Sequence, residues 1–269
     1  MSEEVLKKLE QEPNTKFKTI VNIVVILGIF IWSITGLQTA GGSLNGFIIV
    51  KNIFKGIFTP DLSLINFTKE GIPYLLVETL AIAFLGTLVG AVLAIPFAFL
   101  SSPNMVAKPI SYIFRLFLIF IRTIPTVIYG LIFIRVVGPG PFAGLLTMGI
   151  TSIGMISKLM SEAIQDINKN IIESLSAMGL TKFQKIRHGI MPQLSAMFLS
   201  TIIYRFDINL RDATVLGLVG AGGIGAPLLF AISGYKWSQA GAILICLVIL
   251  VLAIEYFSSK IRNKLIRGY

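Results

Sequence analysis

Long apolar runs alternate with short polar segments along most of the chain. Each run is close to the roughly 20 residues that a helix needs to cross the hydrocarbon core of a bilayer. The pattern predicts six transmembrane helices, which we expect at residues 19–37, 73–100, 109–137, 142–160, 188–204 and 238–257. The fifth run is the least regular, because polar residues and then glycines interrupt it as far as Pro227. The first run exceeds the apolar core of a secretory signal peptide, so we expect it to be retained.

Residues 38–72, between the first two runs, carry a different pattern. Apolar side chains recur there at helical spacing, while Lys51, Asn52 and Lys55 occupy the other side of the same helix. This arrangement is typical of an amphipathic helix that lies in the membrane interface, and we expect it to end before Pro60. The apolar positions are Leu44, Phe47, Ile48, Phe54, Ile57 and Phe58.

Basic residues are concentrated in three segments that lie outside the apolar runs. Residues 1–18, 161–187 and 259–269 carry four Lys or Arg residues each. Cytoplasmic segments of membrane proteins are enriched in Lys and Arg, so these three segments are expected on the cytoplasmic side. The distribution therefore predicts that both termini are cytoplasmic.

The composition excludes a soluble globular protein. Hydrophobic residues make up 55% of the 269 residues and charged residues 13%, with a mean hydropathy of +0.84, whereas soluble domains are about 25% charged. A net charge of +10 would suggest a nucleic-acid partner in a soluble protein. Here the enrichment of Lys and Arg in cytoplasmic segments accounts for the positive net charge, and we expect no nucleic-acid partner. One Cys and one His argue against a disulfide, a metal site or a Cys–His catalytic site, and we expect no cofactor.

The polar segment between the fourth and fifth runs contains an apolar helical face. Asn170 with Glu173, and Thr181 with Gln184, have the spacing of a helix capping box, which predicts two short helices separated at Gly179. An apolar face on a polar segment requires a partner, either the ends of the protein's own helices or a soluble protein. The face consists of Ile172, Leu175, Met178, Phe183 and Ile186.

The spacing of Glu173, Gly179 and Pro192 resembles the EAA signature of binding-protein-dependent ABC importer permeases. The chain departs from that signature, because Ser174 and Leu175 stand at its two alanine positions and two positions just before the proline also differ. The resemblance implies a coupling helix at about residues 170–187, seated in a cleft of a separate ATP-hydrolysing subunit. The coupling residues it implies are Glu173, Leu175, Met178, Gly179, Phe183 and Pro192.

Residues 220–225 formally match the pattern G-x-G-x-x-G. A dinucleotide-binding fingerprint requires a preceding strand and an acidic residue about 20 residues later. Residues 243–250 are wholly apolar, and no Gly-Lys-Ser/Thr follows the glycines, so neither a dinucleotide site nor a P-loop is expected. We therefore expect a transport subunit rather than an enzyme, with ATP hydrolysed on a partner chain.

Residues 204–217 and 219–225 closely resemble the phosphonate-importer permeases, as do residues 121–125 and 138–144. The resemblance covers roughly residues 73–257. It implies an all-α protein of the cell membrane with six transmembrane helices, both termini inside, and the type I ABC importer (MetI-like) permease fold.

The same resemblance implies how the chain is organised and what it binds. A cytoplasmic N-tail at 1–18 precedes the first transmembrane helix and outer amphipathic stretch at 19–72, the core permease domain at 73–258 and a cytoplasmic C-tail at 259–269. The implied partners are two copies of an ATP-binding ABC subunit, an extracytoplasmic substrate-binding protein, a second copy of this chain and the lipid bilayer.

Charged side chains inside a membrane are costly. Asp207 and Arg211 lie four residues apart, so they either pair on one helix face or line a polar cavity for an anion. Glu78 either neutralises an arginine or lies near the outer interface. Guanidinium groups suit phosphoryl oxygens, and the expected pathway residues are Arg122, Thr123, Ser152, Arg205, Asn209, Arg211 and Thr214.

These expectations together favour one function. The chain would be the membrane subunit of an ATP-driven importer for phosphonate or a related phosphorus oxyanion. One alternative is the same permease class with another small solute, such as methionine or phosphate. A second alternative is a stand-alone channel or secondary carrier, which would leave the apolar face of the cytoplasmic segment unexplained.

Overall fold

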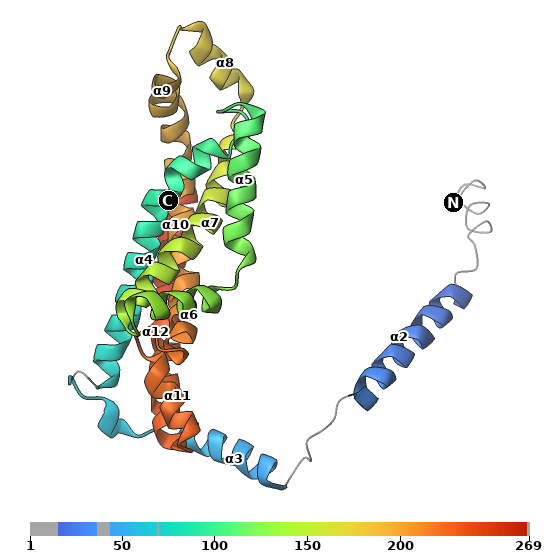
Figure 1. The fold of residues 1–269 in the computed structure, drawn as a ribbon, viewed down its shortest axis with the longest axis vertical. Coiled ribbons are helices and arrows are strands. Elements are labelled where there is room, and N and C mark those ends of the chain that lie inside the picture. Colours follow the sequence, from blue (N-terminus) through green and yellow to red (C-terminus); the bar gives the residue numbers. More distant parts are fainter. Residues whose placement is uncertain (1–15, 37–43, 69, 268–269) are drawn as a thin grey trace. The chain divides into compact units, whose positions relative to one another are not determined.

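The computed structural model describes residues 16–36, 44–68 and 70–267, except for the side chains of residues 16, 17, 36, 44, 45, 169, 172, 182 and 267. Every regular element in these ranges is helical (Figure 1). The chain divides into two units, Met1–Val50 and Lys51–Tyr269. The first unit contains α2 (Lys16–Gly36), which coincides with the first apolar run and whose described side chains are all exposed.

The second unit is a bundle of long helices, in which α4 (Ile72–Leu100) packs along α7 (Pro141–Gln165). Small residues allow the two backbones to approach closely, as is common between membrane helices. A Cβ atom on Gly86 would lie 2.3 Å from the Cβ of Met148, and one on Gly90 would lie 2.5 Å from the Cβ of Ser152. The α4–α7 contact therefore depends on glycine at both positions.

We expect Gly90→Ala to destabilise the bundle and Gly149→Ala to be tolerated. The added methyl group at Gly90 meets Ser152 and the carbonyl of Gly149, and such overpacking costs about 1–3 kcal/mol. A Cβ on Gly149 would make only ordinary contacts, the nearest at 3.7 Å from Val89. Thermal unfolding of the purified variants measures the difference. Equal unfolding midpoints for the two variants would contradict this view of the α4–α7 contact.

The third apolar run is one predicted span but two helices in the structure. α5 (Lys108–Thr123) and α6 (Thr126–Val137) meet at an angle of 84°. Ile124 adopts an extended backbone conformation and Pro125 caps α6. A residue before proline is driven away from the helical region, which explains the break. The expectation of one continuous helix over this run is therefore wrong.

The fifth run also differs from its expected form. α10 (Met191–Leu218) continues without interruption through the polar residues, and a glycine-rich loop at residues 219–224 separates it from α11 (Gly225–Ser233). Arg205, Asp207 and Asn209 are buried in the bundle. By length and hydropathy, four helices of the described chain are suited to cross a membrane, and five if the bent pair α5–α6 is one span. α10 is not among them.

The remaining elements are one long helix that packs along α10 and shorter helices near the two ends of the bundle. α3 (Leu44–Phe58) confirms a helix in the amphipathic stretch, and a short 3-10 helix, η1 (Leu62–Leu64), follows it. α12 (Trp237–Arg267) extends the sixth run and contacts α3 closely, since a Cβ on Gly241 would lie 2.2 Å from the carbonyl oxygen of Gly56. At the end of the bundle opposite α11, α8 (Lys169–Ala177) and α9 (Lys182–Lys185) form a hairpin (Figure 1).

Candidate substrate pathway and coupling segment

A cavity of about 280 Å³ opens where the bend between α5 and α6 faces α7 and α10. We call it the central cavity. The bend opens space beside Arg122 in the last turn of α5, while α7 and α10 contribute polar side chains from the other side. Its lining residues are Ile121, Arg122, Ile124, Thr126, Thr151, Met155, Lys158, Leu159 and Arg205.

Arg205 is the most enclosed cation of the central cavity, with 6% of its surface exposed. Its guanidinium donates to the hydroxyl of Ser152 at 3.2 Å, to the hydroxyl of Thr151 at 3.0 Å and to the sulfur of Met155 at 3.3 Å. All three acceptors are neutral, and within the described part of the chain no carboxylate lies within 4.0 Å of it. The positive charge is therefore held in place without a direct ion pair, and Asp212 of α10 acts on it only from beyond that distance.

Asn209 lies one helical turn after Arg205 and joins three helices. Its side-chain amide donates to Thr87 on α4 and to Ser152 on α7, both at 2.7 Å. Ser152 therefore receives hydrogen bonds from Asn209 and Arg205 together. This network fixes the rotamer of Arg205 next to the cavity, because Ser152, which accepts from the guanidinium, is itself held by Asn209.

Arg122 faces the same cavity with a different environment. Its side chain is exposed, and among the described residues it makes neither a hydrogen bond nor an ion pair. Its aliphatic stem packs on Gly154, where a Cβ would lie 2.7 Å from the Cγ of Arg122. Four expected pathway residues, Arg122, Ser152, Arg205 and Asn209, are thus gathered at or beside one cavity.

The other three expected pathway residues lie elsewhere. The hydroxyl of Thr123 donates to the carbonyl of Ile119, and that of Thr214 donates to the carbonyl of Leu210. Arg211 pairs with Glu255 on α12 at 3.8 Å, and Asp207 lies 4.0 Å from Arg262. Asp207 and Arg211 therefore do not pair with each other on α10, because each finds its partner on the neighbouring helix.

Sequence reasoning missed Thr151, Met155 and Lys158, which line the central cavity from α7. Their spacing of three and four residues places them on one face of the helix. The presence of Ser152 in the fourth apolar run indicated that polar side chains of α7 enter the bundle. Which other residues of α7 reach the cavity depends on the position of α5.

Glu78 has a role that neither sequence interpretation included. Its carboxylate accepts a hydrogen bond from the backbone amide of Gly223 at 2.8 Å, and the neighbouring hydroxyl of Thr79 accepts one from the amide of Ile224 at 2.9 Å. Gly223 has a φ of +76°, a conformation that favours glycine. Glu78 and Thr79 thus tie the glycine-rich loop to α4 near the end that carries α11.

The expected coupling segment forms a helical hairpin. α8 (Lys169–Ala177) ends before Gly179, whose φ is +73°, and α9 (Lys182–Lys185) leads into a π-helical turn, η2 (Ile186–Ile190). The two short helices separated at Gly179 are confirmed. The capping box between Thr181 and Gln184 is also confirmed, since the Thr181 amide donates to the Gln184 side chain at 2.8 Å and the Gln184 amide donates to the Thr181 hydroxyl at 3.4 Å.

The first capping interaction differs from the expected one. Asn168, rather than Asn170, caps α8 by accepting from the backbone amide of Asn170 at 3.0 Å. The helix begins two residues earlier than the Asn170–Glu173 spacing suggested. The expectation of a capping box at that pair is therefore wrong.

The apolar face of the hairpin is only partly covered. Leu175 packs on Gly189, where a Cβ would lie 2.1 Å from its Cδ1. Met178 and Phe183 are 66% and 70% exposed, and Glu173 and Pro192 are also exposed. The side chain of Ile172 lies outside the described residues. The hairpin therefore offers two large apolar side chains and one left-handed glycine at the end of the bundle.

A helical bundle with a cationic cavity inside and an exposed hairpin at one end defines a membrane transport subunit. The chain belongs to the family of binding-protein-dependent transport system inner membrane components, whose model matches residues 90–265. It is accordingly an inner-membrane permease subunit of an ABC transporter, not an enzyme. The family implies an ATP-binding subunit, on which ATP is hydrolysed, and a substrate-binding protein as partners.

Individual relatives agree with this assignment. The chain is 31% identical over 245 residues to a phosphite transport system permease protein of Stutzerimonas stutzeri, which covers 90% of this chain and 87% of the relative. It is 37% identical over 122 residues, 45% of this chain and all of the relative, to a protein of Escherichia coli (strain K12) named for a cryptic phosphonate transport system.

The fold also resembles a solved transporter. A chain of the inward-facing MetNI methionine ABC transporter superposes with a TM-score of 0.64 at 24% sequence identity, which covers 71% of this chain and 96% of that chain. At this identity the likeness concerns the fold alone. The expected type I ABC importer (MetI-like) architecture is confirmed, while the count of six spans is not.

Proposed function

We propose that this permease carries phosphonate or a related phosphorus oxyanion into the cell. The observation that carries the proposal is the excess positive charge that lines the central cavity, where Arg205 is held by neutral acceptors with Asp212 beyond ion-pair distance and Arg122 has no partner among the described residues. A cation left unpaired inside a membrane protein is costly, and a transient oxyanion would offset this cost. Guanidinium forks match the oxygens of a phosphonate.

In this proposal Arg122 and Arg205 contact the substrate, while Ser152 and Asn209 hold Arg205. The names of the relatives support the substrate class, since they concern phosphite and phosphonate. Thr123, Thr214 and Arg211 do not line the central cavity and are not assigned to it.

We also propose six spans with both termini inside and a pathway formed by two copies of the chain. α10 has 28 residues, so at 1.5 Å per residue it is about 40 Å long and can cross a bilayer. Its low hydropathy is compatible with a span because two of its four charged residues, Arg205 and Asp207, are buried in the bundle and Arg211 pairs with Glu255 of α12. On this topology, residues 1–18 and 259–269 are cytoplasmic tails, residues 19–72 hold the first span and the outer stretch, and residues 73–258 form the core permease domain.

The hairpin of α8 and α9 is proposed to be the coupling helix, which docks in a cleft of the ATP-binding subunit, with one such subunit bound to each of the two copies. The exposure of Met178 and Phe183 and the left-handed turn at Gly179 support this role. Glu173 and Pro192 would lie at the same contact, while Leu175 would hold the hairpin on Gly189.

The proposal is tested by reconstituting the chain with its ATP-binding subunit and substrate-binding protein in vesicles. We expect methylphosphonate or phosphite to accumulate only when ATP is hydrolysed, as measured with labelled substrate against a non-hydrolysable ATP analogue. Accumulation without ATP hydrolysis would contradict the ABC mechanism. Uptake of methionine, with no uptake of either phosphorus compound, would contradict the substrate class.

A further inference from the structure

A second cavity, of about 350 Å³, lies between α5 and α7 on the side of the central cavity that leads towards α8. We call it the end cavity. Arg122 and Lys158 line both cavities, so the two are adjacent along the α5–α7 groove. The charged and amide side chains that line the end cavity are those of Arg115, Arg122, Lys158, Glu162 and Gln165.

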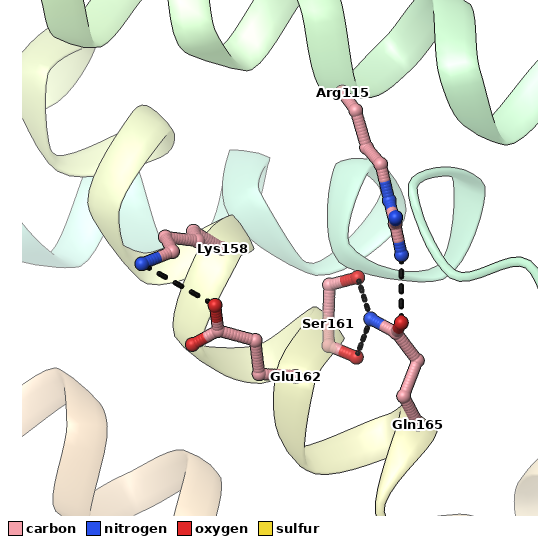
Figure 2. Close-up of polar contacts among 5 residues, drawn as sticks. All are labelled: Arg115, Lys158, Ser161, Glu162 and Gln165. Carbon is pink, nitrogen blue, oxygen red and sulfur yellow. Dashed lines mark hydrogen bonds and ion pairs between the residues drawn. The ribbon is translucent and has the colours of Figure 1, made fainter.

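Arg115 is held in the end cavity by neutral groups, as Arg205 is in the central one (Figure 2). Its guanidinium donates to the carbonyl of Ser101 at 2.9 Å and to the side-chain oxygen of Gln165 at 2.7 Å. Gln165 is itself fixed, because its amide donates to the carbonyl of Ser161 at 2.8 Å and to the Ser161 hydroxyl at 3.2 Å. The positive charge is thus positioned without an acidic partner among the described residues.

Lys158 stands where the two cavities meet, and it is the one cation of the groove with an ion pair among the described residues. Its ammonium lies 3.3 Å from the carboxylate of Glu162, one turn further along α7 (Figure 2). Both side chains are about half exposed, which keeps this pair weak and breakable. An oxyanion that reached Lys158 would therefore compete with Glu162 for the same ammonium group.

The groove as a whole carries an excess of positive charge. The two cavities together hold four cations and one carboxylate, and in the described chain three of the cations have no carboxylate within 4.0 Å. The lining residues of α7 extend from Thr151 to Gln165, which is about 20 Å at 1.5 Å per residue. The four cations are Arg115, Arg122, Lys158 and Arg205.

We propose that the end cavity is a second oxyanion site, which receives the substrate from the central cavity. The inference rests on the proposed function, since it takes the transported phosphorus oxyanion as its ligand. Lys158 passes the anion from Arg122 and Arg205 towards Arg115, and Glu162 limits its residence by competing for Lys158. Continuity with the central cavity favours the transported anion over the phosphate of a lipid headgroup, which shares the same chemistry.

The test compares Lys158→Gln with Glu162→Gln in the complete reconstituted importer. We expect Lys158→Gln to weaken equilibrium binding of labelled methylphosphonate about fivefold, as for the loss of one partly exposed charged contact. Glu162→Gln should strengthen it about threefold, because the competing carboxylate is gone. Lys260→Gln, at an exposed cation of α12 outside both cavities, serves as the matched control and should leave binding unchanged.

Changes in methylphosphonate binding of opposite sign in the two variants indicate a ligand site. If Lys158 and Glu162 formed only a structural ion pair, both variants would lose that pair and binding would change in the same direction. Equal changes in methylphosphonate binding in the two variants, or no change in either, would overturn the end cavity as an oxyanion site. The proposed function would still hold if the wild-type importer takes up the phosphorus oxyanion normally. If the wild-type importer moves no phosphorus oxyanion, both proposals fail.

The lipid headgroup is tested by lipid composition. Effects that persist in vesicles of phosphatidylcholine alone support the transported anion. Effects that occur only when phosphatidylglycerol is added would overturn the inference.

Discussion

Replacing Arg205 by Gln is expected to reduce methylphosphonate uptake at least about a hundredfold without unfolding the protein. Two charge-assisted hydrogen bonds to the oxyanion are lost, each worth about 1.5–3 kcal/mol, and every 1.4 kcal/mol is a factor of ten. Stability should be maintained, because the substitution removes a nearly buried charge that has only neutral contacts. Ser152 would still receive its hydrogen bond from Asn209.

Two measurements separate transport from folding in this variant. Initial uptake rates in reconstituted vesicles report the pathway, and thermal unfolding of the purified protein reports the bundle. Arg211→Gln on the same helix is the matched control, because Arg211 is exposed and pairs with Glu255 away from the central cavity. An equal loss of uptake in both variants, or full uptake in Arg205→Gln, would contradict the assignment of Arg205 to the pathway.

Features that depend on local sequence were the ones that could be predicted from it. Hydropathy located the long helices, since burial in lipid imposes an apolar composition over the whole length of a span. The capping box of Thr181 and Gln184 was also predictable, because both partners lie within one turn. The break at Ile124–Pro125 has a local cause, but its consequence, a cavity beside Arg122, depends on where α7 lies.

Pairings between distant residues could not be predicted in this way. The i,i+4 spacing of Asp207 and Arg211 permits a salt bridge, yet α12 brings Arg262 and Glu255 near them and determines the actual partners. Glu78 and Gly223 are 145 residues apart in the chain, and nothing near Glu78 indicates a backbone amide as its donor. The polar residues of α10 suggested that the fifth transmembrane helix is interrupted. They are buried against neighbouring helices instead, and this burial depends on tertiary packing that the local sequence does not indicate.

Replacing Gly179 by Glu is expected to abolish ATP-driven uptake while the permease still inserts and folds. A left-handed conformation costs a non-glycine residue about 1–2 kcal/mol, and Gly179 has a φ of +73° with open space on the side where a Cβ would project. The larger effect comes from docking, because an unpaired carboxylate buried against the ATP-binding subunit costs about 3 kcal/mol or more. That corresponds to at least about a hundredfold loss of affinity between the two subunits.

Gly138→Glu provides a more demanding strain control for this variant, because the φ of +89° and ψ of 165° of Gly138 lie in a region essentially restricted to glycine. Gly138 also has a positive φ, +89°, and open space around it, but it lies in the turn between α6 and α7. Gly179→Asn is a second control, since Asn tolerates the left-handed conformation and carries no charge. Co-purification with the ATP-binding subunit and uptake should both be lost in Gly179→Glu and largely kept in the controls. Loss in Gly138→Glu as well would indicate backbone strain instead of docking, and full uptake in Gly179→Glu would remove the hairpin from the coupling contact.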